Sequence, residues 1–103
     1  MNRPTHKTAI EAIRRLVSAL GGVCNVLPQS SRGSLHGSAG ISDLYLQMQD
    51  QSVWVEVKVG KDKLSPAQVA FIAREHACGG AVLVGDVDTV IEFLGIEGRG
   101  VKP

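Results

Sequence analysis

Residues 40–59 read GISDLYLQMQDQSVWVEVKV, and this stretch contains the strongest structural signal in the chain. Two runs, 42–48 and 53–59, alternate apolar and polar residues and are separated by four polar residues. This pattern predicts a β-hairpin. Side chains alternate between the two faces of a strand, so the valines of the second run share one face and Trp54, Glu56 and Lys58 share the other.

The register of this hairpin determines which charged residues meet. With Asp50 and Gln51 at the centre of the turn, Asp43 lies opposite Lys58, and Asp43 and Glu56 become diagonal neighbours on one face. Their Cβ atoms are then roughly 7 Å apart. Two carboxylates at that spacing are able to share one cation. A solvent-exposed face with an Asp43–Lys58 pair explains the same spacing equally well, so both interpretations stay open.

The segments around the hairpin predict helices and two further strands. Residues 6–20 carry an apolar stripe at helical spacing that ends at Gly21 and Gly22. A second helix begins with Ser65 as N-cap and Gln68 as its capping-box partner, and it ends at Gly79. Short apolar runs predict strands over 23–27 and 81–84, and residues 88–94 predict a final short helix capped by Asp88 or Thr89. The expected fold class is α/β, a mixed β-sheet flanked by helices in the order α-β-β-β-α-β-α.

Length and composition predict one soluble domain over residues 1–103. The chain has 103 residues, of which 44% are hydrophobic and 20% charged, as in an ordinary globular protein. The longest aliphatic stretch, 81–84, is far too short to span a membrane, and no export signal is evident. Two cysteines, Cys24 and Cys78, are too few for a disulfide framework, so we expect free thiols and a cytoplasmic location.

Charge is unevenly distributed although the formal net charge is only +1. Residues 1–32 hold five basic residues against one acidic residue, whereas residues 75–103 hold five acidic residues against two basic ones. A phosphate-facing surface is therefore expected mainly from the N-terminal third, together with two lysines after the hairpin. A solvated basic helix face explains the pattern about as well. The candidate residues are Arg3, Lys7, Arg14, Arg15, Arg32, Lys61 and Lys63.

Three motifs carry a resemblance to a known family: G-x-x-D at 40–43, E-V-K at 56–58, and L-S-x-x-Q at 64–68. Together they resemble the PD-(D/E)XK nuclease superfamily and, within it, the virus-type replication-repair nuclease domain, VRR-NUC. Holliday-junction resolvases are similar in layout. The resemblance covers residues 7 to about 85 and implies a restriction-endonuclease-like fold. Ser42 stands where the family motif has proline before the aspartate.

The resemblance also implies roles for particular residues. Asp43 and Glu56 would bind Mg²⁺ or Mn²⁺ with help from the backbone carbonyl of Val57. Lys58 would orient and help to deprotonate the attacking water, or stabilise the charged phosphorane. Glu11 matches the family's helix-one carboxylate, a further candidate catalytic residue and metal ligand.

Two of the implied roles have a structural alternative. Glu11 lies on the polar side of its helix, where an i,i+4 ion pair with Arg15 accounts for it. Gln68 completes a capping box and needs no catalytic role, whereas similar nucleases place a glutamine beside the scissile phosphate. For Gln68 both roles are compatible.

The activity implied is a Mg²⁺- or Mn²⁺-dependent DNA endonuclease of a bacterial or phage-infected cell. Branched DNA is the expected substrate, with four-way junctions first and flaps or forks second. Because a junction needs two paired cuts, we expect a homodimer. The long loop over 28–40 would contact the DNA backbone through Ser30, Ser31, Arg32 and His36. The alternatives are a catalytically silent nucleic-acid-binding module of the same fold, and a small α/β interaction domain whose hairpin charges are merely solvated.

Overall fold

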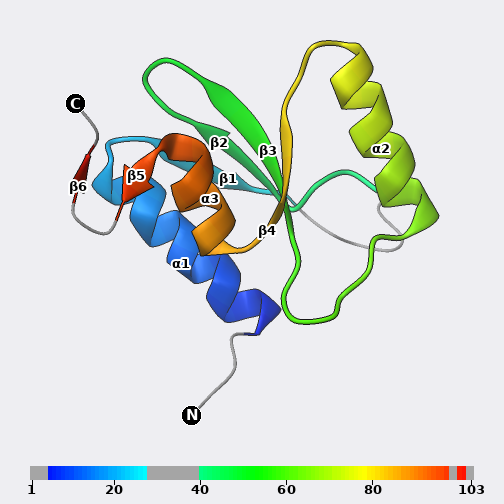
Figure 1. Cartoon of the computed structure of the whole chain (residues 1–103), viewed down its shortest axis with the longest axis horizontal. Helices are drawn as coiled ribbons and strands as arrows, with labels where there is room; N and C mark the ends of the chain where they lie inside the picture. The colour runs from blue at the N-terminus through cyan, green and yellow to red at the C-terminus, as the bar shows by residue number, and fades with distance from the viewer. Residues whose placement is uncertain (1–4, 28–39, 98–99, 102–103) are drawn as a thin grey trace.

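The hairpin predicted from residues 40–59 forms the centre of a four-stranded mixed sheet. The computed structural model describes residues 5–27, 40–97 and 100–101. The sheet has the order β1-β2-β3-β4, and its strands are β1 (Val23–Val26), β2 (Leu44–Gln47), β3 (Ser52–Val57) and β4 (Val82–Gly85). β2 is antiparallel to both of its neighbours, β1 and β3, and β4 is parallel to β3, to which a helical connection joins it (Figure 1). The predicted α/β fold class is confirmed.

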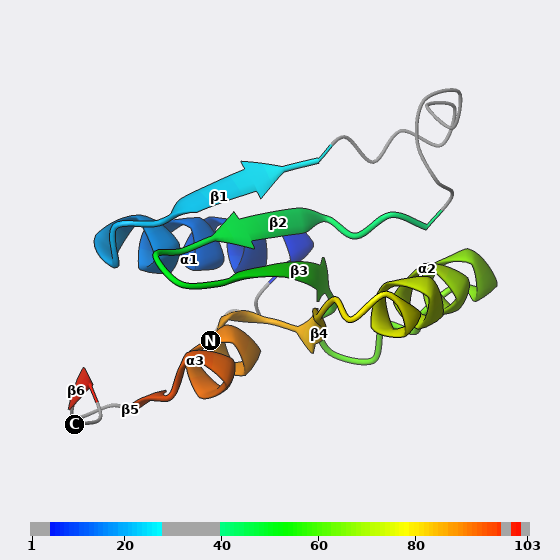
Figure 2. The same cartoon turned by 90° about the horizontal axis from the view of Figure 1, so that it is seen from above.

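The helices lie on both faces of this sheet. α1 (His6–Ala19) and α3 (Val87–Leu94) contact each other and cover the face that bears the valines of β3. α2 (Pro66–Ala77) lies at the β4 side of the sheet in both views (Figures 1 and 2), and its Phe71 ring meets Trp54 edge-on with centroids 5.3 Å apart. The main core is Ala9, Ile13, Val17, Leu44, Leu46, Val53, Val55, Val57 and Val90. The face of β3 that carries Glu56 is therefore the face toward α2.

The boundaries of the predicted helices and strands agree with the structure to within about two residues, and further differences lie near the C-terminus. α3 begins one residue earlier than predicted and its N-cap is Asp86, whose side chain accepts a hydrogen bond from the Asp88 N–H. After α3 a two-stranded ladder forms between β5 (Ile96–Glu97) and β6 (Gly100–Val101). Both cysteines are free. Within the described ranges, none of the helices is long and apolar enough to cross a membrane.

The predicted register of the hairpin is wrong by two residues. Gln47 pairs with Ser52 and Leu44 with Val55, so the turn is centred on Gln49 and Asp50, not on Asp50 and Gln51. The Met48 N–H donates to the Gln51 carbonyl at 2.8 Å, which closes a tight two-residue turn. A slip of two residues keeps every side chain on its predicted face, because the side-chain period of a strand is two.

The corrected register brings the two carboxylates closer than expected. Continued by one residue beyond Leu44 and Val55, it places Asp43 directly opposite Glu56. Lys58 therefore no longer faces Asp43. Directly opposed residues in an antiparallel pair have Cβ atoms about 5 Å apart, against roughly 7 Å for diagonal neighbours.

Gly40 explains how the start of α2 reaches this hairpin. Gly40 has a φ of +80°, and a Cβ atom built there would overlap the carbonyl group of Ala67 and lie 2.6 Å from the amide nitrogen of Gln68. The backbone before β2 thus contacts the first turn of α2 at a distance that only glycine permits. This close approach sets where Gln68 lies relative to the sheet.

We predict that Gly40→Ala destabilises the protein much more than Gly21→Ala. Gly21 has a similar φ of +82° but has no atom within 4 Å of the position a Cβ would take, so it is a matched control for backbone strain alone. Gly21→Ala should cost about 1 kcal/mol, whereas Gly40→Ala should cost about 1–3 kcal/mol more because α2 must move. Urea unfolding of the two variants measures the difference. Equal losses would mean that Gly40 does not position α2.

Candidate active site

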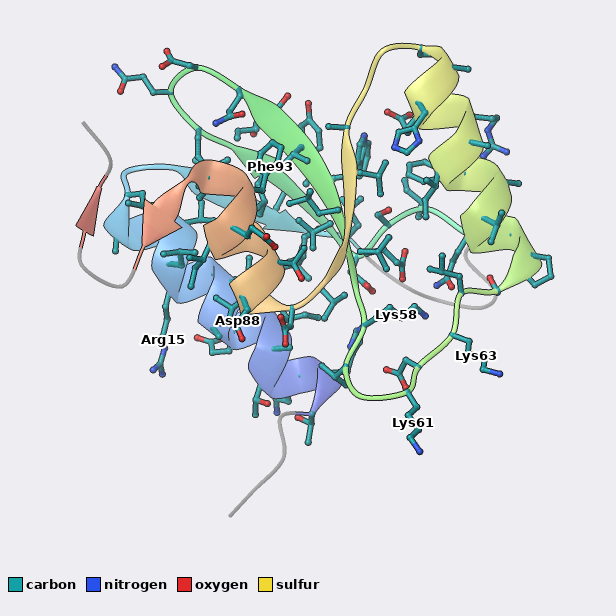
Figure 3. The ribbon with its side chains drawn as sticks, viewed as in Figure 1. Arg15, Lys58, Lys61, Lys63, Asp88 and Phe93 are labelled. Carbon is teal, nitrogen blue, oxygen red and sulfur yellow. The ribbon has the colours of Figure 1, made fainter. Side chains whose placement is uncertain are left out.

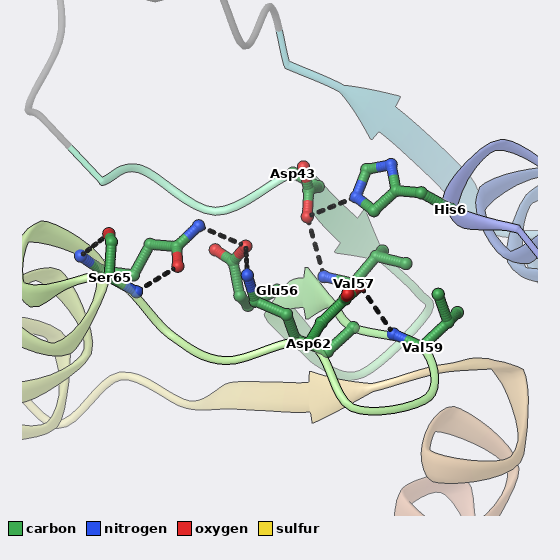
Figure 4. Close-up of polar contacts among 9 residues, drawn as sticks. His6, Asp43, Glu56, Val57, Val59, Asp62 and Ser65 are labelled. Carbon is green, nitrogen blue, oxygen red and sulfur yellow. Dashed lines mark hydrogen bonds and ion pairs between the residues drawn. The ribbon is translucent and has the colours of Figure 1, made fainter.

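Asp43 lies at the start of the hairpin and is almost fully buried, with 4% of its surface exposed. Its backbone carbonyl accepts a hydrogen bond from the Leu27 N–H at 2.9 Å, which extends the pairing with β1. Its Oδ2 accepts the Val57 N–H at 2.8 Å and lies 3.4 Å from Nε2 of His6 (Figure 4). Asp43 is therefore held by backbone on both sides: its carbonyl by the Leu27 N–H and its carboxylate by the Val57 N–H.

Glu56 lies opposite Asp43 and is equally buried, with 2% of its surface exposed. Its Oε2 accepts a hydrogen bond from Nε2 of Gln68 at 2.9 Å and lies 3.9 Å from Nζ of Lys58 (Figure 4). Its Oε1 is buried, and no hydrogen-bond partner for it is found in the described part of the chain. A buried carboxylate oxygen without a donor is costly in free energy unless something else binds it.

Burial and a like charge together perturb the protonation of Glu56. The pKa of Glu56 is raised from 4.5 to about 7, first because burial penalises the charged form and second because the Asp43 carboxyl disfavours ionisation. Lys58 and the buried Ser42 hydroxyl act in the opposite direction but do not cancel the effect. Ser42, which replaces the proline of the family motif, thus contributes to the electrostatics of the site. Without a cation, these two carboxylates resist being charged at the same time.

Gln68 caps α2 and also contacts Glu56, while its catalytic role stays a prediction. Its Oε1 accepts the Ser65 N–H at 2.8 Å and its backbone N–H donates to Oγ of Ser65, so the predicted capping box is confirmed. Its Nε2 remains available and donates to Glu56. The side-chain amide thereby connects the N-terminus of α2 to the carboxylate pair.

Lys58 pairs with Glu56 on its own strand, not with Asp43 across the hairpin. The cross-strand Asp43–Lys58 pair of the solvent-exposed interpretation is therefore wrong, and so is the exposed face that it assumed, because both carboxylates are buried. The Lys58 side chain is 20% exposed, which places it at the edge of the site.

The contact between His6 and Asp43 was not predicted from the sequence. His6 occupies the first position of α1, directly after the N-cap Thr5, and its ring reaches Asp43 from a helix 37 residues away in sequence. The hydrophobic stripe of α1 predicts the buried face but not which residue of the first turn points along the end of the sheet. A histidine next to a helix start was the only available signal, and it is a weak one.

Glu11 is engaged elsewhere on α1. Its carboxylate lies 3.0 Å from Nη1 of Arg14 and 3.7 Å from Nε of Arg15, and all three side chains are about half exposed or more. The i,i+4 pair with Arg15 is therefore present. A catalytic or metal-binding role of Glu11 stays a prediction.

The basic residues predicted to face DNA fall into separate groups. Lys61 and Lys63 are exposed on the connection between β3 and α2, near Lys58, whereas Arg15 projects from α1 away from that connection (Figure 3). Lys7 is exposed in the first turn of α1, beside His6. Arg3, Ser30, Ser31, Arg32 and His36 lie outside the described residues.

The donor set fits a hard divalent cation. Two opposed, buried carboxylates, one with an oxygen that lacks a donor, supply the oxygen ligands that Mg²⁺ and Mn²⁺ prefer. Within the described residues, no three His, Cys, Asp or Glu side chains are yet arranged to hold an ion. Asp43 and Glu56 would hold the ion, and the Val57 carbonyl, which lies next to Glu56 in β3, would be a further ligand.

We predict that the metal-free protein loses stability as the pH rises from about 4.5 to about 7. Between these values the folded state retains a proton on Glu56 that the unfolded state has released, so the free energy of unfolding falls as the pH increases. The expected loss is about 1–3 kcal/mol. Glu56→Gln keeps an oxygen for the Gln68 amide but cannot ionise, so its free energy of unfolding should depend less on pH. Urea unfolding at a series of pH values measures the difference.

Glu92→Gln is the control for this measurement, because Glu92 is exposed on α3 and the substitution should leave the slope unchanged. A Glu56→Gln variant with the same pH slope as the wild type would contradict the raised pKa.

Comparison with known proteins places this arrangement in a family. The family model for the VRR-NUC domain matches residues 4–89. A solved structure described as a VRR-NUC domain is 26% identical, superposes with a TM-score of 0.66, and its match covers 86% of this chain and 97% of that one. Curated protein sequences give no match. The chain therefore belongs to the VRR-NUC family, a nuclease family within the PD-(D/E)XK superfamily.

Proposed function

We propose that this protein is a divalent-metal-dependent DNA endonuclease that hydrolyses phosphodiester bonds. The observation that supports this most strongly is the buried, opposed pair of Asp43 and Glu56, with the pKa of Glu56 raised to about 7. Two like charges out of water are stable only when a cation or a proton compensates them. In a member of a nuclease family, a divalent cation is the compensating charge that also serves the reaction.

Each polar side chain of the site has a defined task in this proposal. A cation bound by Asp43 and Glu56 would neutralise phosphate oxygens and acidify the attacking water. Lys58, at the edge of the site, orients that water and helps to deprotonate it, or stabilises the charge of the phosphorane. Gln68 holds the Glu56 carboxylate in place through its 2.9 Å hydrogen bond. The products would carry 5′-phosphate and 3′-hydroxyl ends.

We place branched DNA first among the substrates, with four-way junctions before flaps and forks. Exposed Lys61 and Lys63 lie on the connection that leaves the site, where a phosphate backbone entering the site would run (Figure 3). A protein with one site per chain makes two paired cuts most directly as a two-fold dimer. The homodimer is therefore part of the proposal.

The second candidate is a nucleic-acid-binding module of the same fold without turnover. The arrangement of Asp43, Glu56 and Lys58 favours the nuclease. Nζ of Lys58 lies 3.9 Å from Oε2 of Glu56, and Asp43 accepts the N–H of Val57, the residue after Glu56. A module without catalysis would have no need to retain two buried carboxylates.

We predict that Lys58→Ala reduces the cleavage rate about 10²–10³-fold while Mn²⁺ binding persists, because Lys58 acts on the water and not on the ion. Asp43→Asn should lose both cleavage and metal binding. The measurement is single-turnover cleavage of labelled linear, flap, forked and four-way DNA with Mg²⁺ or Mn²⁺. Four-way DNA should be cut fastest, and at two symmetric positions. In light scattering the protein should have the mass of a dimer.

Asp88→Asn is the control, because Asp88 is exposed on α3, on the other face of the sheet (Figure 3). Near-normal turnover in Lys58→Ala would overturn the proposed mechanism. DNA binding without cleavage by the wild type, under every metal and substrate, would favour the binding module.

A further inference from the structure

The backbone of His6 is held beside Asp43 by the way α1 begins. Thr5 and Thr8 form a reciprocal capping box, in which Oγ1 of Thr5 accepts the Thr8 N–H at 3.1 Å and Oγ1 of Thr8 accepts the Thr5 N–H at 2.8 Å. This box holds the first turn of α1 in place. His6, the first residue of that turn, therefore stands at a defined position against Asp43.

In the contact between His6 and Asp43, the His6 side chain is free to move and the Asp43 side chain is held in place. The His6 side chain is 48% exposed, whereas the Asp43 side chain is 5% exposed and also accepts the Val57 N–H. The separation of 3.4 Å between Nε2 and Oδ2 is longer than a strong hydrogen bond. Asp43 lies between Glu56 and His6 (Figure 4). Of these three side chains, the imidazole is the one that can move, because it is half exposed and its contact with Asp43 is long.

We propose that His6 is the third side-chain ligand of the divalent cation and binds it through Nε2. This inference rests on the proposed function, because it assumes that the cation binds at Asp43. Adjacent ligand atoms on an octahedral ion with bonds of about 2.1 Å lie about 3 Å apart. The ring nitrogen needs only a small shift from its 3.4 Å distance to satisfy that geometry.

The metal-free arrangement explains why the ring must move. The described side chains contain no trio of His, Cys, Asp and Glu already placed to hold an ion. Asp43 is fixed by backbone and Glu56 by the Gln68 amide, while nothing described holds the imidazole except its long contact with Asp43. Glu11, the one acidic residue of α1, is paired with Arg14 and Arg15.

A nitrogen ligand changes which ion the site prefers. Both ions favour oxygen ligands, but Mn²⁺, a transition-metal ion, accepts an imidazole nitrogen more readily than Mg²⁺ does. His6 therefore makes the site selective for Mn²⁺ over Mg²⁺. A site built only from Asp43, Glu56 and a carbonyl would discriminate less between Mn²⁺ and Mg²⁺.

The test is pulsed EPR of the whole protein with Mn²⁺ alone, at one fixed pH, without DNA. The wild type should show ¹⁴N coupling from a directly bound imidazole, and His6→Ala should lose that coupling while Mn²⁺ still binds. His76→Ala is the matched control, because His76 is exposed in the last turn of α2, and it should retain the signal. His6 is half exposed, so its substitution should not unfold the protein, and thermal melts verify this for each variant.

Calorimetric titration with each metal supplies the second measurement. His6→Ala should weaken Mn²⁺ binding about 10-fold or more and Mg²⁺ binding less. His6→Glu, which restores an oxygen donor, should recover Mg²⁺ binding better than Mn²⁺ binding and so lower the selectivity.

Two outcomes overturn the inference, and they are distinguishable. If Mn²⁺ binds in a manner that requires Glu56 but gives no ¹⁴N coupling in the wild type, His6 only orients Asp43, and the proposed function stands. If Mn²⁺ does not bind the wild type, the metal site itself is absent, and both proposals fail.

Discussion

The hydrogen bond from the Val57 N–H to the Asp43 carboxylate, at 2.8 Å, ties the fold to the site. In an antiparallel ladder that N–H would ordinarily donate to a backbone carbonyl of the opposite strand. Here a side chain takes that place at the end of β2, where the Asp43 carbonyl already accepts the Leu27 N–H of the chain leaving β1. The Asp43 carboxylate is thus part of the sheet's own hydrogen bonding, and it is buried for that reason.

Other elements converge on the same pair of strands. The Gly40 backbone contacts the first turn of α2, and the Gln68 amide of that turn reaches Glu56. The capping box of α1 places His6 at the opposite side of Asp43. α1 and α2 therefore each place one polar side chain against a carboxylate of the hairpin. The site lies where the ends of the strands meet the first turns of α1 and α2. The Asp43 and Glu56 carboxylates are buried because these elements enclose them.

The sequence predicted much of this arrangement because its strongest signals are local. The alternation in residues 42–48 and 53–59 and the Ser65–Gln68 capping box depend on neighbours a few residues away, and both are confirmed. The hairpin register was wrong because Gln49-Asp50 and Asp50-Gln51 are both acceptable turn centres, and neither contains the glycine that would identify one. The His6–Asp43 contact joins residues 37 positions apart, so no local pattern contains it.

The central claim is that Asp43 and Glu56 are buried together to hold a divalent cation. Four thermal melts at neutral pH test it: wild type and Asp43→Asn, each with and without Mg²⁺. Mg²⁺ should raise the wild-type melting temperature by binding the folded state and should do little for the variant. Without metal, Asp43→Asn should be at least as stable as the wild type, because asparagine keeps an acceptor for the Val57 N–H and removes the like charge beside Glu56. A clearly destabilised Asp43→Asn, together with a wild type that does not respond to Mg²⁺, would mean that Asp43 is only structural.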